Sequence, residues 1–239
     1  MMKKEAKIYG VGLGVGDPEL ITLKAFRVMR ECDVIVLPTG DRENSNAYKI
    51  ACAACPEIEE KETVCFEFPM TRDKETLEAR RDEIFARVSE LVRGGKTVAF
   101  LVIGDPSVYA TYSYIELRAK KEELACESIS GITSFTAAAA RLGLPLVLED
   151  EELHIIPGSA DLSEAVKLPG TKVFMKLGKK KDALLALLAP AEQKGLLEVY
   201  AVEKCGTKDE RVFAGLSEIP EDLSYLSTVV VKDRRGADS

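Results

Sequence analysis

The chain has 239 residues, of which 46% are hydrophobic and 31% are charged, a balance typical of a soluble globular protein. No apolar run approaches the roughly 18 residues that a membrane-spanning helix needs, and a net charge of −7 leaves no basic footprint for nucleic acid. The first residues include lysines but no apolar signal segment after them, so we expect a cytoplasmic protein.

The first glycine-rich stretch is Gly12-Leu-Gly-Val-Gly-Asp-Pro18, which follows a predicted strand over residues 6–12 and precedes a predicted helix over residues 19–30. In a dinucleotide-binding fingerprint the third glycine would fall on Val15 or Asp17, and the lysine of a phosphate-binding loop is missing. The stretch is therefore either a close-approach turn for another ligand or a tight connection that binds nothing.

The rest of the first half alternates between strand and helix patterns. Asp73 is a plausible helix cap, and the glycine pair at 94 and 95 ends the helix that it opens. The predicted elements are strands over residues 33–38, 63–68 and 97–103, helices over residues 48–55 and 74–93, and a polar loop over residues 39–48.

A Gly-Asp-Pro turn, residues 104–106, closes the strand over residues 97–103. We expect Pro106 to open a helix that runs to about residue 123, with Tyr109, Tyr112, Ile115 and Leu117 near one face. Open α/β sheets bind ligands just beyond the carboxyl ends of their strands, which is where this turn lies. An ordinary strand-to-helix connection is the alternative.

The alternation of strand and helix patterns is interrupted near residue 122 and then begins again. This predicts two domains, residues 1–122 and 123–239. In the second, Thr133 or Ser134 can cap an alanine-rich helix that Gly143 ends. The connections are short, so we expect a mixed sheet. Its predicted strands cover residues 126–130, 153–157, 171–177, 197–202 and 226–232, and a helix is predicted over residues 182–188.

Side chains for acid–base or metal chemistry are scarce. His154 is the only histidine and lies in mid-strand, so we interpret it as a simple surface or core residue. Six cysteines are too few for a disulfide scaffold, and Cys52 and Cys55 are better explained as buried thiols than as a redox or metal pair. We expect no protein-bound metal. The small-residue turns favour binding of a polar cofactor through the main chain and a reaction driven by positioning.

Three motifs resemble those of the tetrapyrrole (corrin/porphyrin) methylases, in the same order and over nearly the whole chain. They are Gly10-Val-Gly-Leu-Gly-Val-Gly-Asp-Pro-Glu-Leu-Ile-Thr-Leu-Lys-Ala25, Ile103-Gly-Asp-Pro-Ser-Val-Tyr109 and Gly131-Ile-Thr-Ser-Phe-Thr-Ala-Ala-Ala-Ala140. The resemblance implies an α/β fold of two αβα domains with the active site in the trough between them, a homodimer, and S-adenosylmethionine as the methyl donor. The chain departs from the family at Val15, where a proline is usual.

Four further stretches resemble the precorrin-2 / cobalt-factor II C-20 methyltransferases within that family. They are Phe68-Pro-Met-Thr-Arg-Asp73, Val173-Phe-Met-Lys-Leu-Gly178, Glu210-Arg-Val212 and Tyr225-Leu-Ser-Thr-Val229. The narrower resemblance implies methyl transfer to the meso carbon C-20 of precorrin-2 or cobalt-factor II during cobalamin synthesis.

The resemblance also assigns residues to the cofactor. It implies that the methyl donor contacts the Gly-Asp-Pro turn in the first domain and small or sulfur-bearing side chains in the second. These residues are Ile103, Gly104, Asp105, Val108, Thr133, Ser134, Met175, Cys205 and Ser227.

The tetrapyrrole would face the glycine-rich loop and a few cations that bind its carboxylates. Gly14, Asp17 and Tyr109 would position it, and no residue is assigned as a catalytic base. The substrate-binding residues would be Val15, Arg72, Tyr109, Lys176 and Arg211, with Arg72 first because a guanidinium binds a carboxylate through two hydrogen bonds.

Several alternatives remain open at this point. The chain could methylate another ring position, or a protein substrate such as diphthine, although the stretch over residues 68–73 argues against the latter. A non-catalytic nucleotide-binding module could use the same glycine turns. The presence of cobalt in the substrate is also undecided, because few side chains need touch the ring centre.

Overall fold

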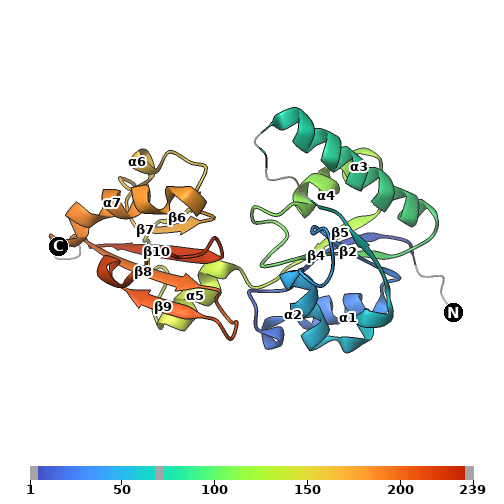
Figure 1. Cartoon of the computed structure of the whole chain (residues 1–239), viewed down its shortest axis with the longest axis horizontal. Helices are drawn as coiled ribbons and strands as arrows, with labels where there is room; N and C mark the ends of the chain where they lie inside the picture. Colours follow the sequence, from blue (N-terminus) through green and yellow to red (C-terminus); the bar gives the residue numbers. More distant parts are fainter. Residues whose placement is uncertain (1–4, 68–70, 72, 235–239) are drawn as a thin grey trace. The chain divides into compact units, whose positions relative to one another are not determined.

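The computed structural model describes residues 5–67, 71 and 73–234. The chain divides into two compact units, residues 1–133 and residues 134–239. Each unit has its own sheet, as Figure 1 shows, and among the described residues each sheet has five strands. The predicted α/β class is therefore confirmed.

The first unit is built on a parallel sheet with the strand order β3-β2-β4-β1-β5. Parallel sheets are covered on both faces, so their central strands are apolar throughout, and every residue of β2 and β4 is buried. The strands are β1 (Ile8–Gly12), β2 (Val34–Leu37), β3 (Glu62–Cys65), β4 (Val98–Val102) and β5 (Cys126–Ile129).

Helices cover both faces of this sheet (Figure 1). Alternate residues of β4 point to opposite sides: Phe100 packs in the core beneath α3 and α4, whereas Ala99 and Leu101 pack in the core beneath α1 and α2. The helices are α1 (Leu23–Glu31), α2 (Asn46–Ala54), α3 (Lys74–Arg93) and α4 (Tyr112–Lys121), with short 3-10 helices η1 (Pro18–Leu20) and η2 (Pro56–Glu60).

Strand β5 belongs to the first sheet, although the sequence pattern placed it in the second domain. It pairs in parallel with β1, from Ile8 opposite Cys126 to Val11 opposite Ile129. The charged residues 120–123, which resemble a linker, end α4 and turn the chain back toward the sheet, and the amide of Leu124 donates to the carbonyl of Ala119 at 2.9 Å.

The helix expected directly after the Gly-Asp-Pro turn begins later, at Tyr112. Residues 106–111 form turns in between, and Tyr109 has a positive φ of 47°. The prediction that the apolar residues of this helix share one face is also wrong, because Tyr112 and Ile115 are buried whereas Leu117 is 65% exposed. The first helix also begins later than predicted. The short helix η1 comes first, and α1, which Thr22 caps, begins at Leu23. The cap of α3 at Asp73 is confirmed.

The second unit contains the mixed sheet that the sequence predicts, in the order β6-β7-β10-β8-β9. Strands β6 and β7 are parallel, and each remaining neighbour pair is antiparallel. The edge strand β9 was missed because its alternating half-buried and exposed residues give a weak pattern. The strands are β6 (Leu153–Pro157), β7 (Thr171–Met175), β8 (Leu197–Glu203), β9 (Arg211–Ala214) and β10 (Ser227–Asp233).

The helices of this unit lie on opposite faces of its sheet (Figure 1). The alanine-rich helix α5 packs against β8 and β10, and its small side chains allow a close approach. The other face carries the apolar core of the unit, which includes Phe174, Val229 and Val231. The helices are α5 (Ser134–Leu142), α6 (Leu162–Ala165) and α7 (Lys181–Glu192), with 3-10 helices η3 (Gly178–Lys180) and η4 (Leu216–Glu218).

A buried carboxylate joins β8, β9 and the loop before β10. Glu203 is 1% exposed, and it accepts hydrogen bonds from the guanidinium of Arg211 and from the amide of Ser224, the latter at 2.7 Å. Desolvation alone would raise the pKa of Glu203, but these hydrogen bonds outweigh it and lower the pKa to about 2.

The first prediction concerns Gly10, in the middle of β1. A Cβ at this position would lie 2.6 Å from Cζ of the fully buried Tyr112 ring, so Gly10→Ala overpacks the core. We expect the variant to lose about 1–3 kcal/mol of unfolding free energy, measured by urea denaturation. The matched control is Gly40→Ala, whose Cβ would meet only Glu67 at 3.7 Å. Equal stability of the two variants would contradict this packing.

The second prediction follows from Glu203, whose pKa is lower in the folded state. Its ionised form adds stability above about pH 4.5, and this stability is lost as the pH falls toward about 2. Arg211→Met should therefore lower the free energy of unfolding at neutral pH, and the difference from wild type should shrink over that acid range. Arg234→Met, which breaks the exposed pair with Glu198, is the control and should change little. A difference in unfolding free energy between Arg211→Met and wild type that stays constant with pH would refute this explanation.

Candidate functional site

The strand order of the first sheet places a topological switch point between β1 and β4. The two strands are neighbours, but the chain leaves β1 for α1 on one face and leaves β4 for α4 on the other. Ligands of open α/β sheets bind at such switch points, beyond the carboxyl ends of the strands. The residues found there are the glycine loop, residues 12–18, and the Gly-Asp-Pro turn.

Backbone hydrogen bonds join these two turns directly. The amide of Gly104 donates to the carbonyl of Gly14 at 2.6 Å, and the amide of Gly14 donates to the carbonyl of Gly104 at 3.3 Å. The amide of Leu13 donates to the carbonyl of Val102 at 2.9 Å. Gly14 and Gly104 thus form an isolated antiparallel bridge just beyond the parallel pairing of β1 with β4.

A third glycine turn, residues 130–133 after β5, packs against the same place. A Cβ on Gly12 would lie 2.6 Å from the amide nitrogen of Gly131, and a Cβ on Gly131 would collide with the carbonyl of Gly104. Gly104 differs: its φ is +79°, and a Cβ added there would meet no atom within 4 Å. Gly12 and Gly131 therefore serve contacts within the protein, whereas Gly104 borders open space.

Asp105 ties the turns together. Its carboxylate accepts hydrogen bonds from the amide and hydroxyl of Ser107, at 2.8 and 2.5 Å, and from the amide of Gly131 at 3.1 Å. The carboxylate is only 9% exposed. These bonds join the Gly-Asp-Pro turn to the third turn, a role that sequence patterns did not distinguish from helix capping.

We call the carboxyl edge of the first sheet, with its three glycine turns, the glycine edge. Asp17 caps the short helix η1 at this edge, where its carboxylate accepts a hydrogen bond from the amide of Glu19 at 2.9 Å. Val15, Val108 and Thr133 are half-buried. Large side chains from all three turns remain exposed: Leu20 and Ile103 (37% each), Ile132 (36%) and Tyr109 (43%).

The second unit brings together two of the predicted cofactor residues and one that was missed. The hydroxyl of Ser134 lies 4.0 Å from the sulfur of Met175 and 3.1 Å from the hydroxyl of Thr228. The buried Thr228 belongs to the recognised stretch over residues 225–229, which could have indicated it. Ser227 is turned toward its own loop, and its hydroxyl donates to the carbonyl of Ser224 at 2.8 Å.

Cys205 lies in a loop that Glu210 holds together. Glu210 accepts from the amide of Gly206 at 2.7 Å and from the guanidinium of Arg141. Burial, together with the nearby Glu210, raises the pKa of Cys205 to about 11. The thiol is therefore neutral near pH 7, which suits packing against a ligand better than nucleophilic attack.

The predicted substrate cations differ in their surroundings. Lys176 directly follows β7 and is exposed with a φ of 55°, although desolvation by the surrounding protein lowers its pKa. Arg211 is bonded to both Glu203 and Asp222, so its charge is largely compensated. Arg72 lies outside the described residues.

The three lysines over residues 179–181 differ in exposure: Lys179 is exposed, Lys180 is half-buried and Lys181 is buried. Lys180 donates to the carbonyl of Ala160 at 2.9 Å. Lys181 is buried, and its ammonium donates to the carbonyls of Pro220 and Glu221. These two lysines stabilise the unit.

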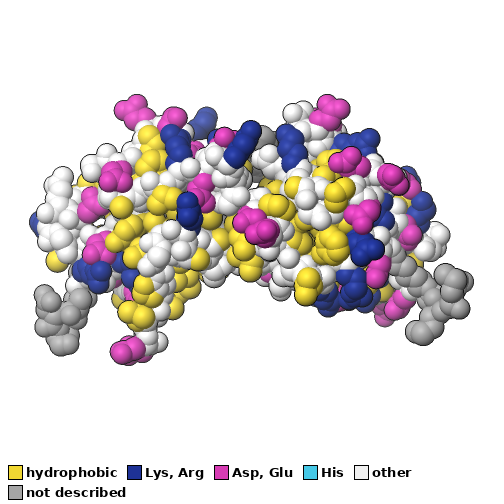
Figure 2. Space-filling view, turned by 90° about the horizontal axis from the view of Figure 1, so that it is seen from below, with side chains coloured by type: hydrophobic (Ala, Val, Ile, Leu, Met, Phe, Trp, Pro, Cys, Tyr) yellow, Lys and Arg dark blue, Asp and Glu magenta, His cyan; other side chains and the backbone are white. Residues whose placement is uncertain are grey.

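Other chemistries find little support within the described ranges. No group of three or more metal-ligating side chains occurs there, and no helix is long and apolar enough to span a membrane. His154 lies 3.0 Å from the carboxylate of Glu152 in an edge strand. Burial raises the pKa of Cys55 to about 11, as expected for a structural thiol. On the face in Figure 2, basic and acidic side chains are interspersed.

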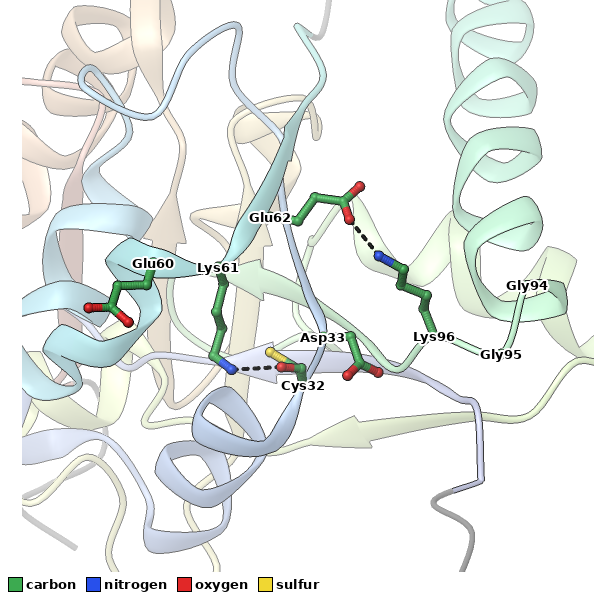
Figure 3. A pocket seen from close by; sticks show the side chains of 8 residues that line it. All are labelled: Cys32, Asp33, Glu60, Lys61, Glu62, Gly94, Gly95 and Lys96. Carbon is green, nitrogen blue, oxygen red and sulfur yellow. Dashed lines mark hydrogen bonds and ion pairs between the residues drawn. The ribbon is translucent and has the colours of Figure 1, made fainter.

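A polar pocket of about 600 Å³ lies at the opposite edge of the first sheet (Figure 3). Its residues precede β2, β3 and β4, apart from Glu62, which is the first residue of β3, and they include none of the predicted site residues. Its polar groups are largely bonded to the protein: Lys61 donates to the carbonyls of Arg30 and Cys32, and Lys96 pairs with Glu62. The lining is Cys32, Asp33, Glu60, Lys61, Glu62, Gly94, Gly95 and Lys96.

Three curated relatives resemble the chain over nearly its whole length. The probable cobalt-precorrin-2 C(20)-methyltransferase of Methanocaldococcus jannaschii is 34% identical, covering 97% of this chain and 98% of its own. The cobalt-precorrin-2 C(20)-methyltransferase of Salmonella typhimurium is 31% identical, with 94% and 95% covered. The precorrin-2 C(20)-methyltransferase of a Sinorhizobium species is 28% identical, with 95% and 97% covered.

Solved structures share the fold. Cobalt precorrin-4 methyltransferase superposes with a TM-score of 0.77 at 19% identity, covering 97% of both chains. Uroporphyrin-III C-methyltransferase from Thermus thermophilus, in complex with S-adenosylhomocysteine, has a TM-score of 0.67 at 23% identity, with 95% and 97% covered. Residues 7–220 match the model of one protein family. The chain belongs to the tetrapyrrole (corrin/porphyrin) methylases.

Proposed function

We propose that this protein transfers a methyl group from S-adenosylmethionine to the meso carbon C-20 of precorrin-2 or of its cobalt-containing counterpart, in cobalamin synthesis. The observation that carries the proposal is the end-to-end similarity to C(20)-methyltransferases, at 34% and 31% identity. The matched part of the chain includes the glycine edge. It also includes the stretches of the second unit that resemble the C-20 methyltransferases, residues 173–178, 210–212 and 225–229.

The cofactor would be held mainly by main-chain groups of the first unit and side chains of the second. Gly104 fits this role because its α-carbon borders open space, and the neutral thiol of Cys205 fits contact with an uncharged group. The proposed cofactor residues are Ile103, Gly104, Asp105, Val108, Thr133, Ser134, Met175, Cys205 and Ser227, to which the structure adds Thr228.

The tetrapyrrole would be held by apolar contact with its ring and by ion pairs with its carboxylates. The exposed ring of Tyr109 and the half-buried Val15 supply apolar surface. Arg72 and Lys176 are the proposed cations, and Arg211 would have to share its guanidinium with Glu203 and Asp222.

The proposed chemistry needs positioning rather than a strong base. S-adenosylmethionine supplies a methyl group already activated by its sulfonium, and the meso carbon of a reduced tetrapyrrole is enamine-like and nucleophilic. Gly14, Asp17 and Tyr109 would align this carbon with the methyl group. The carboxylate of Asp105 accepts three hydrogen bonds from the turns, which suits a role in holding them in place.

We further propose that the protein is a homodimer located in the cytoplasm. Family resemblance supports both statements. Sedimentation analysis of the purified protein tests the first, and a monomer at micromolar concentration would exclude it.

The third prediction tests Asp105. Asp105→Ala removes all three accepted hydrogen bonds, so the glycine edge should loosen. S-adenosylhomocysteine should then bind at least about tenfold more weakly in calorimetry, because a hydrogen bond to a charged group contributes about 1.5–3 kcal/mol. The protein should stay folded.

The control for this prediction is Asp161→Ala. Asp161 likewise accepts from the amide and hydroxyl of the serine two residues on, at 3.0 and 2.7 Å, but it caps α6 in the second unit. Its removal should cost similar stability and leave cofactor binding unchanged. Unchanged binding in Asp105→Ala would remove Asp105 from the cofactor site.

The fourth prediction tests the reaction itself. With labelled S-adenosylmethionine under anaerobic conditions, precorrin-2 and cobalt-factor II are offered in parallel. We expect one new methyl group, at C-20, and the faster substrate identifies the pathway. Methylation at another carbon would correct the assigned position. Tight cofactor binding with no transfer to any tetrapyrrole would favour a non-catalytic binding module.

A further inference from the structure

Two lysines in the second unit share an unusual backbone conformation at the same edge of the sheet. Lys176 directly follows β7 with a φ of 55°, and Lys204 directly follows β8 with a φ of 46°. Side chains other than glycine rarely adopt positive φ, and such residues are concentrated at ligand sites. The sequence motifs had indicated Lys176 but not Lys204.

The sheet topology places these lysines close together. Strands β7 and β8 flank β10, and both are antiparallel to it, so they run in the same direction and end at the same edge. Thr228 pairs with Met175 on one side and Val202 on the other, so the two strands end at nearly the same level. Two strand spacings separate their ends by about 10 Å.

The carboxylates next to Lys204 are already bound to other groups. Glu203 accepts from Arg211 and the amide of Ser224, and Glu210 accepts from Arg141 and the amide of Gly206. Within the part of the chain that the structure describes, no carboxylate pairs with the half-buried Lys204. Its positive charge is therefore available to an anionic ligand at this edge.

We propose that Lys204 is a second carboxylate-binding residue for the substrate, acting together with Lys176. Each ammonium binds a different acetate or propionate group at the periphery of the tetrapyrrole, and the spacing of the two strands orients the ring. The inference rests on the proposed function, and it adds a substrate-binding residue that the resemblance did not supply.

The variant Lys204→Gln tests the proposal in steady-state methyl transfer to precorrin-2 or cobalt-factor II. We expect KM for the tetrapyrrole to rise roughly tenfold, with kcat and the affinity for S-adenosylhomocysteine nearly unchanged. Lys204→Arg should restore most of the loss. The wild-type KM should also increase more steeply with salt than that of the variant. The control Lys194→Gln loses the same charge before β8, at the opposite edge of the sheet, and should behave like wild type.

A binding measurement without turnover distinguishes two outcomes: that Lys204 does not bind the substrate, and that the protein does not carry out the proposed reaction. Uroporphyrin III carries the same acetate and propionate groups, and its binding is followed by absorbance without turnover. Weaker binding to Lys204→Gln than to wild type and Lys194→Gln supports the proposal, even if no methyl group is transferred. Equal binding to all three proteins, or an unchanged KM in the variant, overturns it. So does absence of any binding to wild type.

Discussion

Backbone contact between three glycine turns is the constraint on which the first unit's site depends. Strands β4, β1 and β5 are neighbours, and the turns that follow them meet without side chains between them. The reciprocal hydrogen bonds of Gly14 and Gly104 form an antiparallel bridge between two turns, and the carboxylate of Asp105 accepts from the amide of Gly131 in the third turn. A Cβ at Gly12 or Gly131 would separate these turns, so the two glycines maintain the shape of the edge, whereas a Cβ at Gly104 would meet no atom within 4 Å.

The two units offer different chemistry. The glycine edge presents backbone and exposed apolar side chains such as Ile103 and Tyr109, whereas the second unit presents hydroxyls, a thioether and cations. Some of the cations in the second unit serve its own structure: Arg211 pairs with the buried Glu203, and Lys181 donates to the carbonyl of Pro220.

Much of the fold could be predicted because parallel strands, caps and glycine stops leave strong local patterns. The buried run of β4 and the cap at Asp73 are examples. The predictions were wrong where contacts between distant parts of the chain decide which elements form or pair. Whether β5 joins the first or second sheet depends on pairing with β1, and the late start of α4 depends on the hydrogen bonds of Asp105. Among the proposed site residues, Thr228 lies in a stretch that a motif could have indicated, whereas the position of Lys204 beside Lys176 follows from the pairing of β7 and β8 with β10 and not from a motif. Arg72 stays a prediction from sequence.

The most direct test of the account is amide hydrogen exchange of the whole protein with and without S-adenosylhomocysteine. We predict slower exchange in the glycine loop, in residues 103–109 and in residues 130–134, because these turns form the proposed cofactor edge. The opposite edge, around Asp33 and Lys96, should exchange at the same rate in both states. Protection centred on that opposite edge, with the glycine turns unaffected, would contradict the account.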